Sequence, residues 1–477
     1  MSRSETQRSA SPAGGVYPPD TLGMTADEMR RLGHEVVELV VDRLCRRQSA
    51  PAILTGSARE LMEQLGGPAP VEPMDVESSL ALLCDVALAH QQSGDHPRYF
   101  ARVPGPASFA AVLGEWLATG FNTIASSWAG GSGPATLELV VVEWLREQLG
   151  LPAGTEGVLV SGGSMANLTA IAAARAECGA GVAYLTEQTH SSINRGLRSI
   201  GFPDNDICVM ESDDQFRMDL EALKAAVAND RSAGRRPSMV IATAGTTNTG
   251  AVDPLPELAD YCAIEGLWLH VDGAYGAPAA LTDRGRATLE GIERADSVVL
   301  DPHKWLFQPY DVGCTLVARP GALERAFSMN PEYLKDVQSQ EASGEVDLRN
   351  RSLELTRRSR AVKLWLTFRT YGVRRMAAAI ERGIDLAEYA EEAVRRRNAE
   401  WELVTPAQLG IVTFALRGAS RAQHDRAARL LADSGFAVVT STMLRQRSVL
   451  RLCLINPLTT EGDIDETLSR LAEFGRS

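Results

Sequence analysis

The stretch Asp301-Pro302-His303-Lys304-Trp305 directly follows the short apolar run Ser297-Val298-Val299-Leu300. A short run rich in valine predicts a buried strand. A lysine after such a strand is ordinarily solvated, but here Pro302 and Trp305 restrict Lys304 and remove part of its water. We therefore expect the pKa of Lys304 to be lowered and its amine to be a nucleophile.

Asp272 follows a second apolar run, residues 267–271. A carboxylate at the end of a parallel strand lies where α/β folds contact ligands, although many such aspartates only cap a turn. Together with Lys304 it predicts a site for pyridoxal 5'-phosphate. Lys304 would form an imine with the cofactor, and Asp272 would pair with its ring nitrogen. The small residues Gly273 and Ala274 would let the flat ring lie against the strand end.

Other polar groups follow predicted strands and are expected at the same site. Ser161-Gly162-Gly163-Ser164 begins a helix, so its N–H groups are expected to hold a phosphate. His190 would stack on the ring and also touch the substrate carboxylate. Thr246 would bond either the phenolic oxygen or the substrate, and His303 would either reach the phosphate or shape the position of Lys304. Each signal is weak by itself, since lone histidines are more often structural. The predicted cofactor contacts are Gly163, Ser164, His190, Thr246, Asp272, Ala274, Asp301, His303 and Lys304.

From residue 96 onward, short apolar runs alternate with amphipathic helical patterns. This alternation predicts an α/β fold with a mostly parallel sheet covered on both faces. Strands are predicted at 157–160, 182–186, 239–244, 267–271, 297–300 and 315–318, and helices at 136–149, 165–177, 220–229 and 255–265. After Gly372, a charged helix at 376–399 leads to a small α+β domain. Its predicted strands are 410–416, 436–440 and 449–454, and its helices are 423–434 and 461–474.

The N-terminal region has a different character. Residues 1–23 have the composition of a disordered tail. Thr25 and Glu28 form a capping-box pattern that begins a helix, and a second helix is predicted at 76–91. These helices have apolar faces but no core of their own. The predicted organisation is therefore a tail, a helical segment at 24–95, a large domain at 96–375 and a small domain at 376–477.

Composition excludes several classes of function. The formal charge of −13 and the pI of about 5.2 argue against nucleic acid or an anionic membrane as the main partner. The 477 residues include no apolar run long enough for a membrane span and no secretory signal. Seven cysteines without a CxxC pair fit a reduced cytoplasm and predict no metal site.

The ordered set of motifs resembles the group II pyridoxal-phosphate decarboxylases, the aromatic-L-amino-acid decarboxylase family. The matching segments are 96–100 (HPRYF), 127–128 (SW), 161–164 (SGGS), 190–192 (HSS), Thr246, Asp272, 301–305 (DPHKW), 330–335 (NPEYLK), 357–358 (RR) and 363–365 (KLW). The resemblance implies a fold-type I transferase-like architecture. It also implies a homodimer whose N-terminal helices wrap the partner subunit and whose active site lies at the subunit interface.

The resemblance also assigns roles to single residues. Lys304 would be the Schiff-base lysine, Asp272 the pyridinium partner and His190 the stacking group. Asp301 stands where animal members have asparagine, so it would need a compensating donor beside the phosphate. Tyr333 would protonate the substrate's Cα after CO₂ leaves. Relatives with phenylalanine there release an aldehyde, and Tyr333 therefore favours simple decarboxylation.

The predicted substrate pocket departs from the aromatic decarboxylases. Arg102-Val103, Ser126 and Thr356 occupy positions where animal enzymes carry Tyr-Phe, Phe and Gly, while Trp128 matches. Fewer aromatic contacts favour a non-standard substrate from specialised metabolism over a planar aromatic one. Arg102 could pair with an anionic group or form an exposed salt bridge. Oxidative deamination and β-elimination of an S-substituted cysteine stay open, and a cofactor-binding protein without catalysis is a remote alternative.

Overall fold

The computed structural model describes residues 22–103, 105–329 and 344–476, which form two compact units. The first unit contains residues 22–50 and 57–89. Its helices are α1 (Ala26–Arg46), α2 (Ala58–Leu65), α3 (Val76–Leu82) and the π-helical turn η1 (Leu83–Ala87). The predicted capping box begins α1, with the Glu28 carboxylate accepting a hydrogen bond from the Thr25 N–H. These four elements bury none of their residues, as expected for helices without a core of their own.

The larger sheet of the second unit has the strand order β1-β7-β6-β5-β4-β2-β3. Only β7 runs antiparallel to its neighbours, and the other pairs are parallel. The predicted α/β class with a mostly parallel sheet is confirmed. The strands are β1 (Glu156–Val160), β2 (Val182–Thr186), β3 (Ile207–Met210), β4 (Pro237–Thr243), β5 (Trp268–Asp272), β6 (Ser297–Leu300) and β7 (Gly313–Val317).

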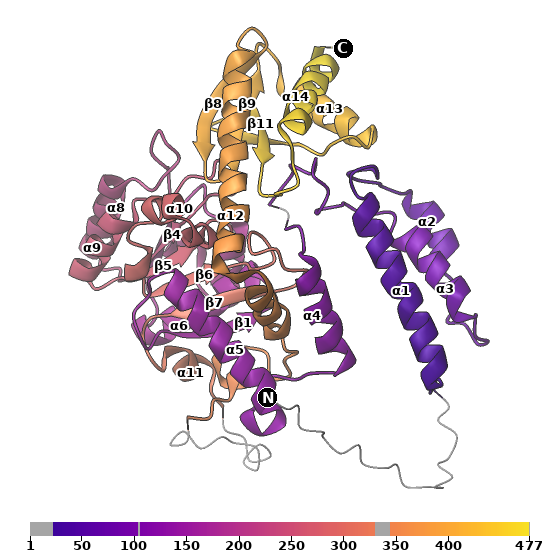
Figure 1. Ribbon diagram of the computed structural model, residues 1–477. Coiled ribbons are helices and arrows are strands. Elements are labelled where there is room, and N and C mark those ends of the chain that lie inside the picture. Colours follow the sequence, from indigo (N-terminus) through magenta and orange to yellow (C-terminus); the bar gives the residue numbers. More distant parts are fainter. Residues whose placement is uncertain (1–21, 104, 330–343, 477) are drawn as a thin grey trace, which may run out of the picture. The chain divides into compact units, whose positions relative to one another are not determined.

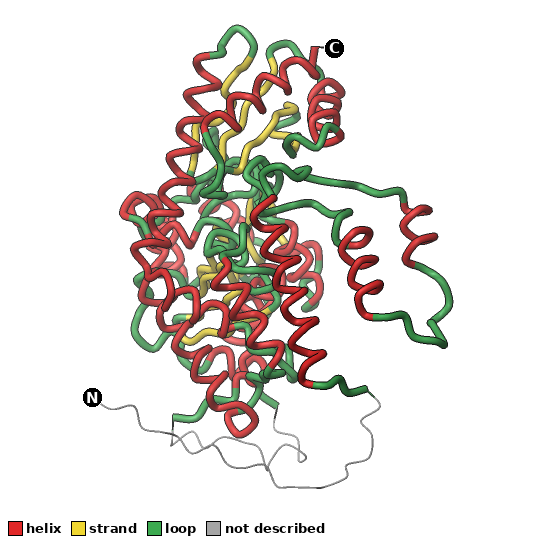
Figure 2. Tube along the Cα trace, turned by 45° about the vertical axis from the view of Figure 1, so that its right-hand side comes forward, coloured by secondary structure: helices red, strands yellow, loops and turns green. Residues whose placement is uncertain are grey.

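Both faces of this sheet are covered by helices, and Figure 2 shows the strands enclosed between them. Along β4, Val240 and Ala242 pack into one apolar cluster, whereas Met239 and Ile241 pack into another. This alternation is what a strand buried on two faces requires. The first face is covered mainly by α5 (Trp128–Gln148), α8 (Leu220–Ser232), α9 (Leu255–Glu265) and α12 (Ala361–Arg396), and the second by α6 (Gly163–Cys178), α7 (Ser191–Ser199) and α11 (Ala322–Phe327).

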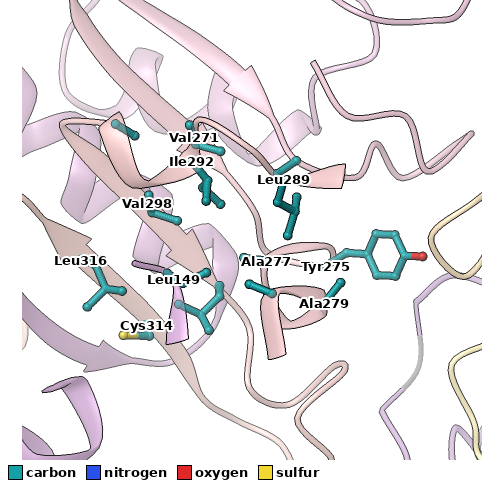
Figure 3. Packing of buried hydrophobic residues seen from close by; sticks show 14 of the residues in the cluster. Leu149, Val271, Tyr275, Ala277, Ala279, Leu289, Ile292, Val298, Cys314 and Leu316 are labelled. Atoms are coloured by element: carbon teal, nitrogen blue, oxygen red, sulfur yellow. The ribbon is translucent and has the colours of Figure 1, made fainter. Parts of the chain in front are cut away.

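Tyr275 lies at the edge of the first cluster. Figure 3 shows its ring extending away from the aliphatic side chains, with the hydroxyl pointing outward. The ring stacks on Trp305 with centroids 5.2 Å apart and an interplanar angle of 11°. The hydroxyl accepts a 2.6 Å hydrogen bond from the N–H of Gly410. One aromatic pair thus joins the loops after β5 and β6 to a turn of the smaller sheet.

The smaller sheet is antiparallel in the order β10-β11-β9-β8, and α12 runs from the larger sheet up to it (Figure 1). Gly372 interrupts α12 with φ 68°, a conformation that glycine adopts at little cost. The smaller sheet comprises β8 (Trp401–Gln408), β9 (Ile411–Leu416), β10 (Thr440–Leu444) and β11 (Arg447–Cys453), with helices α13 (Arg421–Asp433) and α14 (Glu461–Arg476).

Several predicted elements differ from the structure. A strand was expected at 436–440, but β10 begins only at Thr440. Its hairpin turn places Arg445 and Gln446 at positive φ, without the glycine or asparagine that would signal such a turn. Strands β3 and β8 were not predicted, and the helix expected at 76–91 ends in η1 at Ala87. The remaining elements are α4 (Phe109–Gly120), α10 (Asp283–Thr288), η2 (Asp204–Asp206), η3 (Ala277–Leu281), η4 (Ile292–Arg294) and η7 (Leu348–Arg351).

Among the described residues, no helix combines the length and the apolarity that crossing a membrane would take.

Candidate active site

A cavity of about 430 Å³ lies where β1, β2, β4, β5 and β6 end. These strands end at one edge of the sheet because β7, antiparallel to both neighbours, leaves β1 pointing the same way as β6. Open α/β sheets bind their ligands at this edge. The lining comprises 161–165 and Asn167 after β1, His190 and Ser192 after β2, Thr243, Gly245 and Thr247 at β4, Asp272, Ala274 and Tyr275 at β5, and Asp301, His303 and Lys304 after β6.

Lys304 lies in this cavity with its Nζ 3.0 Å from Oδ2 of Asp301, and its side chain is 23 % exposed. Burial has the largest single effect on the pKa of Lys304 and lowers it. The charges of Asp301 and Asp272, with the hydrogen bond to Asp301, together raise this pKa above its ordinary value. The expected lowering is wrong, because two carboxylates outweigh the loss of water.

The first turn of α6 borders the cavity, and within the described part of the chain no side-chain cap binds its N–H groups. Its N-cap, Gly162, has φ 122° and supplies no side-chain cap. A Cβ added at Gly163 would lie 2.6 Å from Oδ2 of Asp301, so a side chain there would close this end of the cavity. Uncapped N–H groups at a helix N-terminus attract an anion. The geometry therefore fits the phosphate site expected at residues 161–164.

His303 points a donor toward the same end of the cavity. Its Nδ1 accepts a hydrogen bond of 3.2 Å from the Val312 N–H, so the neutral ring carries its proton on Nε2. Burial, the largest effect, lowers the pKa of His303 and favours that neutral ring. Its Nε2 lies 3.6 Å from Oδ2 of Asp301. Lys304 is thus the donor that compensates the charge of Asp301, because the His303 nitrogen lies beyond hydrogen-bond distance.

Asp272 is buried with both carboxylate oxygens engaged. Its Oδ2 accepts a 3.0 Å hydrogen bond from Nδ2 of Asn167, and its Oδ1 accepts one of 3.1 Å from the Ala274 N–H. A carboxylate held in this way keeps lone pairs directed at the cavity, where it can pair with a cationic ring nitrogen. His190 is the N-cap of α7 and also lines the cavity.

Comparison with known proteins decides what this cavity belongs to. Residues 62–417 match the model of the pyridoxal-dependent decarboxylase conserved domain. An aromatic-L-amino-acid decarboxylase of Bacillus atrophaeus is 42% identical over 464 residues, covering 95% of this chain and 96% of that protein. The chain belongs to the pyridoxal-dependent decarboxylase family. As a pyridoxal-dependent decarboxylase it is a lyase, and its cofactor is pyridoxal 5'-phosphate.

Two solved structures extend the comparison. The structure of Oryza sativa TDC with PLP and tryptamine matches with a TM-score of 0.90 and 28% identity, over 97% of this chain and 99% of that one. A 4-hydroxyphenylacetaldehyde synthase of Rhodiola rosea matches with a TM-score of 0.87 and 27% identity, over 95% and 99%. The fold of this decarboxylase is therefore shared by relatives whose names describe different products.

The cavity of the decarboxylase fits its cofactor. The N–H groups in the first turn of α6 and the Nε2–H of His303 would hold the phosphate, and Asp272 would face the ring nitrogen. Lys304 would carry the covalent link. Oδ1 of Asp301 is buried and has no hydrogen-bond partner within the described residues, and its charge opposes an anion nearby.

Not every predicted site residue of the decarboxylase lies in this cavity. Thr246 is buried, and its hydroxyl is 2.7 Å from that of Thr249, whereas its neighbour Thr247 lines the cavity. Arg102, Val103, Ser126, Trp128 and Thr356 do not contribute to the lining. Tyr333 lies outside the described residues.

The Ser126 segment is instead part of the scaffold. The Ser126 hydroxyl accepts a 2.8 Å hydrogen bond from the Arg357 N–H, and its carbonyl accepts one from the Arg349 N–H. Trp128 is held through its backbone N–H, which donates to the Asp347 carboxylate at 2.8 Å. Val103 packs against the core, and Thr356 is exposed. Within a single chain, these residues do not face the cofactor cavity.

Sequence reasoning assigned no role to seven residues that line the cavity, namely Met165, Asn167, Ser192, Thr243, Gly245, Thr247 and Tyr275. Asn167 was detectable from the sequence, because it is a lone amide in an alanine-rich helix. In the structure it is only 1 % exposed. Buried amides of this kind are hydrogen-bonded and specific. Tyr275 could not be found in this way, because its stacking on Trp305 depends on tertiary structure.

Replacing Asp301 with asparagine is expected to lower the pKa of Lys304, because it removes a charge and a charged hydrogen bond that raise it. The apoenzyme should then capture pyridoxal phosphate at half its maximal rate at a lower pH, since only the free amine reacts. The rise of the visible cofactor band, followed as a function of pH, measures this. Asp311→Asn on the same loop is the control, because Asp311 pairs with Arg360. An unchanged midpoint in Asp301→Asn would contradict the expectation.

Proposed function

We propose that this enzyme converts an aromatic L-amino acid to its amine with release of CO₂. The main observation in support is that Lys304, Asp272 and His190 surround one cavity at the carboxyl ends of the strands of the larger sheet. The aromatic side chain is supported by the relatives' names, which include the tyrosine decarboxylase and tryptophan decarboxylase 2 of Oryza sativa.

Each residue has a distinct task in this proposal. Pyridoxal phosphate supplies the electron sink for the pair left when CO₂ departs. Lys304 would hold the cofactor covalently, and as a free amine it could accept or return a proton. Asp272 would keep the ring nitrogen protonated. His190 would stack against the ring and donate to the substrate carboxylate, orienting the bond that breaks.

The expectation of a non-standard substrate from specialised metabolism, rather than a simple aromatic one, stays a prediction. It depended on Arg102, Val103, Ser126 and Thr356 as pocket residues. The Ser126 hydroxyl is used by Arg357 and Val103 packs into the core, which weakens the argument that these two substitutions were made for a polar substrate.

A second candidate substrate class is an amino acid with an anionic side chain. The observation that favours it is the charge of Arg102. Burial raises the pKa of Tyr310, while the charges of Lys304 and Arg102 act to lower it. The Tyr310 ring lies 4.9 Å from that of His303. In this candidate, the Arg102 guanidinium would pair with a carboxylate or sulfonate on the substrate.

Product analysis by mass spectrometry tests the proposal. The cofactor-loaded enzyme would receive aromatic, acidic and S-substituted cysteine amino acids separately. An aromatic amine with equimolar CO₂ is the expected result, and an amine from acidic amino acids alone would favour the Arg102 candidate. Aldehyde with peroxide, or pyruvate with a thiol, would replace the proposal with oxidative deamination or β-elimination. No product from any member would favour the cofactor-binding alternative.

Replacing Tyr333 with phenylalanine is expected to shift the product from amine toward aldehyde and peroxide. The physical reason is that the phenol is the proposed proton donor to Cα, and without it the carbanion survives long enough to meet O₂. The ratio of aldehyde to amine, measured on one substrate in air, reports the change. Tyr310→Phe is a matched control and should leave the ratio unaltered. An unchanged ratio in Tyr333→Phe would remove Tyr333 from the reaction.

We also propose that the enzyme is a homodimer in a reducing cytoplasm. All seven cysteines are free thiols, which supports that compartment. Helix α4 supports the dimer, because Phe109, Leu113 and Leu117 repeat every fourth residue and remain exposed, with Phe121 just beyond at 79 % exposure. An exposed stripe of large apolar side chains marks an interaction surface.

Leu117→Glu is expected to weaken this dimer, because a charge in an apolar interface loses its water without gaining a partner. Light scattering over a dilution series should show monomers at concentrations where the wild type is dimeric. Thr119→Glu, on an exposed position of the same helix outside the stripe, should leave the mass unchanged. A dimer of unaltered strength in Leu117→Glu would place the interface elsewhere.

A further inference from the structure

A continuous series of buried hydrogen bonds runs behind the cavity and begins at Trp268. Its indole Nε1–H donates to the hydroxyl of Ser297 at 2.8 Å, and an indole can only donate. The same hydroxyl lies 2.9 Å from Nδ1 of His270. His270 is fully buried, and desolvation, the largest effect, lowers its pKa to about 4. Its ring is therefore neutral at pH 7, with one donor nitrogen and one acceptor nitrogen.

Asn167 decides which nitrogen of His270 carries the proton. Its amide lies between His270 Nε2 at 3.0 Å and Asp272 Oδ2 at 3.0 Å. A carboxylate only accepts, so the amide nitrogen must face Asp272 and the amide oxygen must face His270. An amide oxygen also only accepts, and Nε2 of His270 therefore bears the proton. Its Nδ1 then accepts the Ser297 hydroxyl proton.

The direction of these bonds continues to His190. The second N–H of the Asn167 amide donates to the hydroxyl of Ser192 at 3.2 Å. That hydroxyl, already an acceptor, has its own proton left for Nδ1 of His190 at 2.8 Å. The Ser192 backbone N–H donates to the same Nδ1 at 3.3 Å. Two donors converge on Nδ1, which leaves the ring proton of neutral His190 on Nε2.

We infer that Asn167 and His270 are positioning residues that fix the protons of the active site, holding Asp272 as an acceptor and His190 as a donor through Nε2. The inference rests on the proposed roles of Asp272 and His190 in cofactor and substrate binding. One amide serves both residues through two branches of hydrogen bonds. One of its protons goes to Asp272, and the other goes to Ser192, which binds His190. His190 thereby presents an N–H to the cavity, which is the group that a substrate carboxylate would bind.

The ring tautomers can be measured directly without turnover. The chain has seven histidines, so protein labelled with ¹⁵N in its histidine rings gives a countable set of nitrogen resonances. His190→Gln and His270→Gln assign the two of interest. We expect both rings to carry the proton on Nε2, in the apoenzyme and in the cofactor-loaded enzyme. A proton on Nδ1 of either ring would overturn the inference, whatever substrate the enzyme accepts.

Asn167→Ala tests whether the amide couples the two branches. We expect the His190 ring resonances to shift, because the Ser192 hydroxyl that donates to Nδ1 loses its own donor. The dissociation constant of pyridoxal phosphate should rise by about tenfold, because Asp272 loses a charged hydrogen bond. Ser192→Ala cuts only the His190 branch. It should alter the His190 resonances and weaken cofactor affinity less than Asn167→Ala does, because Asp272 keeps its hydrogen bond, which keeps the test sound if Asn167→Ala folds poorly.

Thr169→Val is the matched control. Thr169 lies on the same helix, is fully buried, and its hydroxyl has no hydrogen-bond partner within the described structure. It should leave both the tautomers and the cofactor affinity at wild-type values. If Asn167→Ala and Thr169→Val behave alike, Asn167 is a packing residue and the inference fails. An enzyme inactive on every amino acid tested, yet with Nε2–H rings, would refute the proposed function and retain the inference.

Discussion

Replacing Lys304 with alanine is expected to abolish decarboxylation and to remove the visible absorption band that lysine-bound pyridoxal phosphate produces. The reason is that Lys304 lines the cavity, with its Nζ 3.0 Å from Asp301 and its pKa raised by the charges of Asp301 and Asp272 against the lowering effect of burial. Absorption spectra of the purified variant, mixed with excess cofactor, measure the loss. A band that persists and remains sensitive to borohydride would contradict the assignment.

Lys304 can be compared with a second buried lysine, Lys363, as the site of cofactor attachment. The chain has four lysines, Lys224, Lys304, Lys335 and Lys363. Burial, the largest effect, lowers the pKa of Lys363 to about 7, which by itself would make it the better nucleophile. However, its Nζ donates to the carbonyls of Pro309 and Asp311 and lies 3.0 Å from Glu115. Peptide mapping after borohydride reduction should find the cofactor on Lys304. Label on Lys363 would show that pKa outweighs position.

Arg357→Leu is expected to destabilise the fold by about 3–5 kcal/mol, the usual cost of leaving one buried charge without its partner. Arg357 and Glu138 are both fully buried and form an ion pair of 2.6 Å. The guanidinium also donates to the carbonyls of Ala125 and Leu159. A lower midpoint of urea unfolding, at unchanged slope, would report the loss.

Two further variants separate charge from packing. Arg198→Leu removes an exposed pair with Asp204 and should cost less than about 1 kcal/mol. The double change Glu138→Leu with Arg357→Leu removes both charges and should recover part of the lost stability. If the double variant is less stable than Arg357→Leu by the full cost of a second deletion, the destabilisation comes from lost packing and not from an unpaired charge.

The positions of the chemical groups could be predicted because they depend on local rules. Asp272, Lys304 and residues 161–164 each follow a short apolar strand, and the ends of parallel strands meet at one edge. The family resemblance then ordered these pieces and named the cofactor. The same local rules missed β10, because its turn uses Arg445 and Gln446 at positive φ instead of a recognisable turn pair.

The electrostatics could not be predicted from local sequence. The sign of the Lys304 pKa shift depends on two carboxylates, one from the loop after β6 and the other at the end of β5. The Asn167 amide binds His270 and Asp272, which follow it in the sequence by 103 and 105 positions. The predicted substrate-pocket residues were chosen by resemblance to the family. A matching position in the sequence does not say whether a side chain faces the cofactor cavity of its own subunit.

The stack of Tyr275 on Trp305 limits how this scaffold can diverge. Trp305 directly follows Lys304, and Tyr275 directly follows Ala274, so the stacked rings tie the amine loop to the acid loop. The Tyr275 hydroxyl further ties both to Gly410 of the smaller sheet. A descendant enzyme could exchange the residues that select a substrate one at a time, but could not move its acid and its amine apart without rebuilding this junction. New specificities are therefore expected to arise around an inherited chemical centre of constant dimensions.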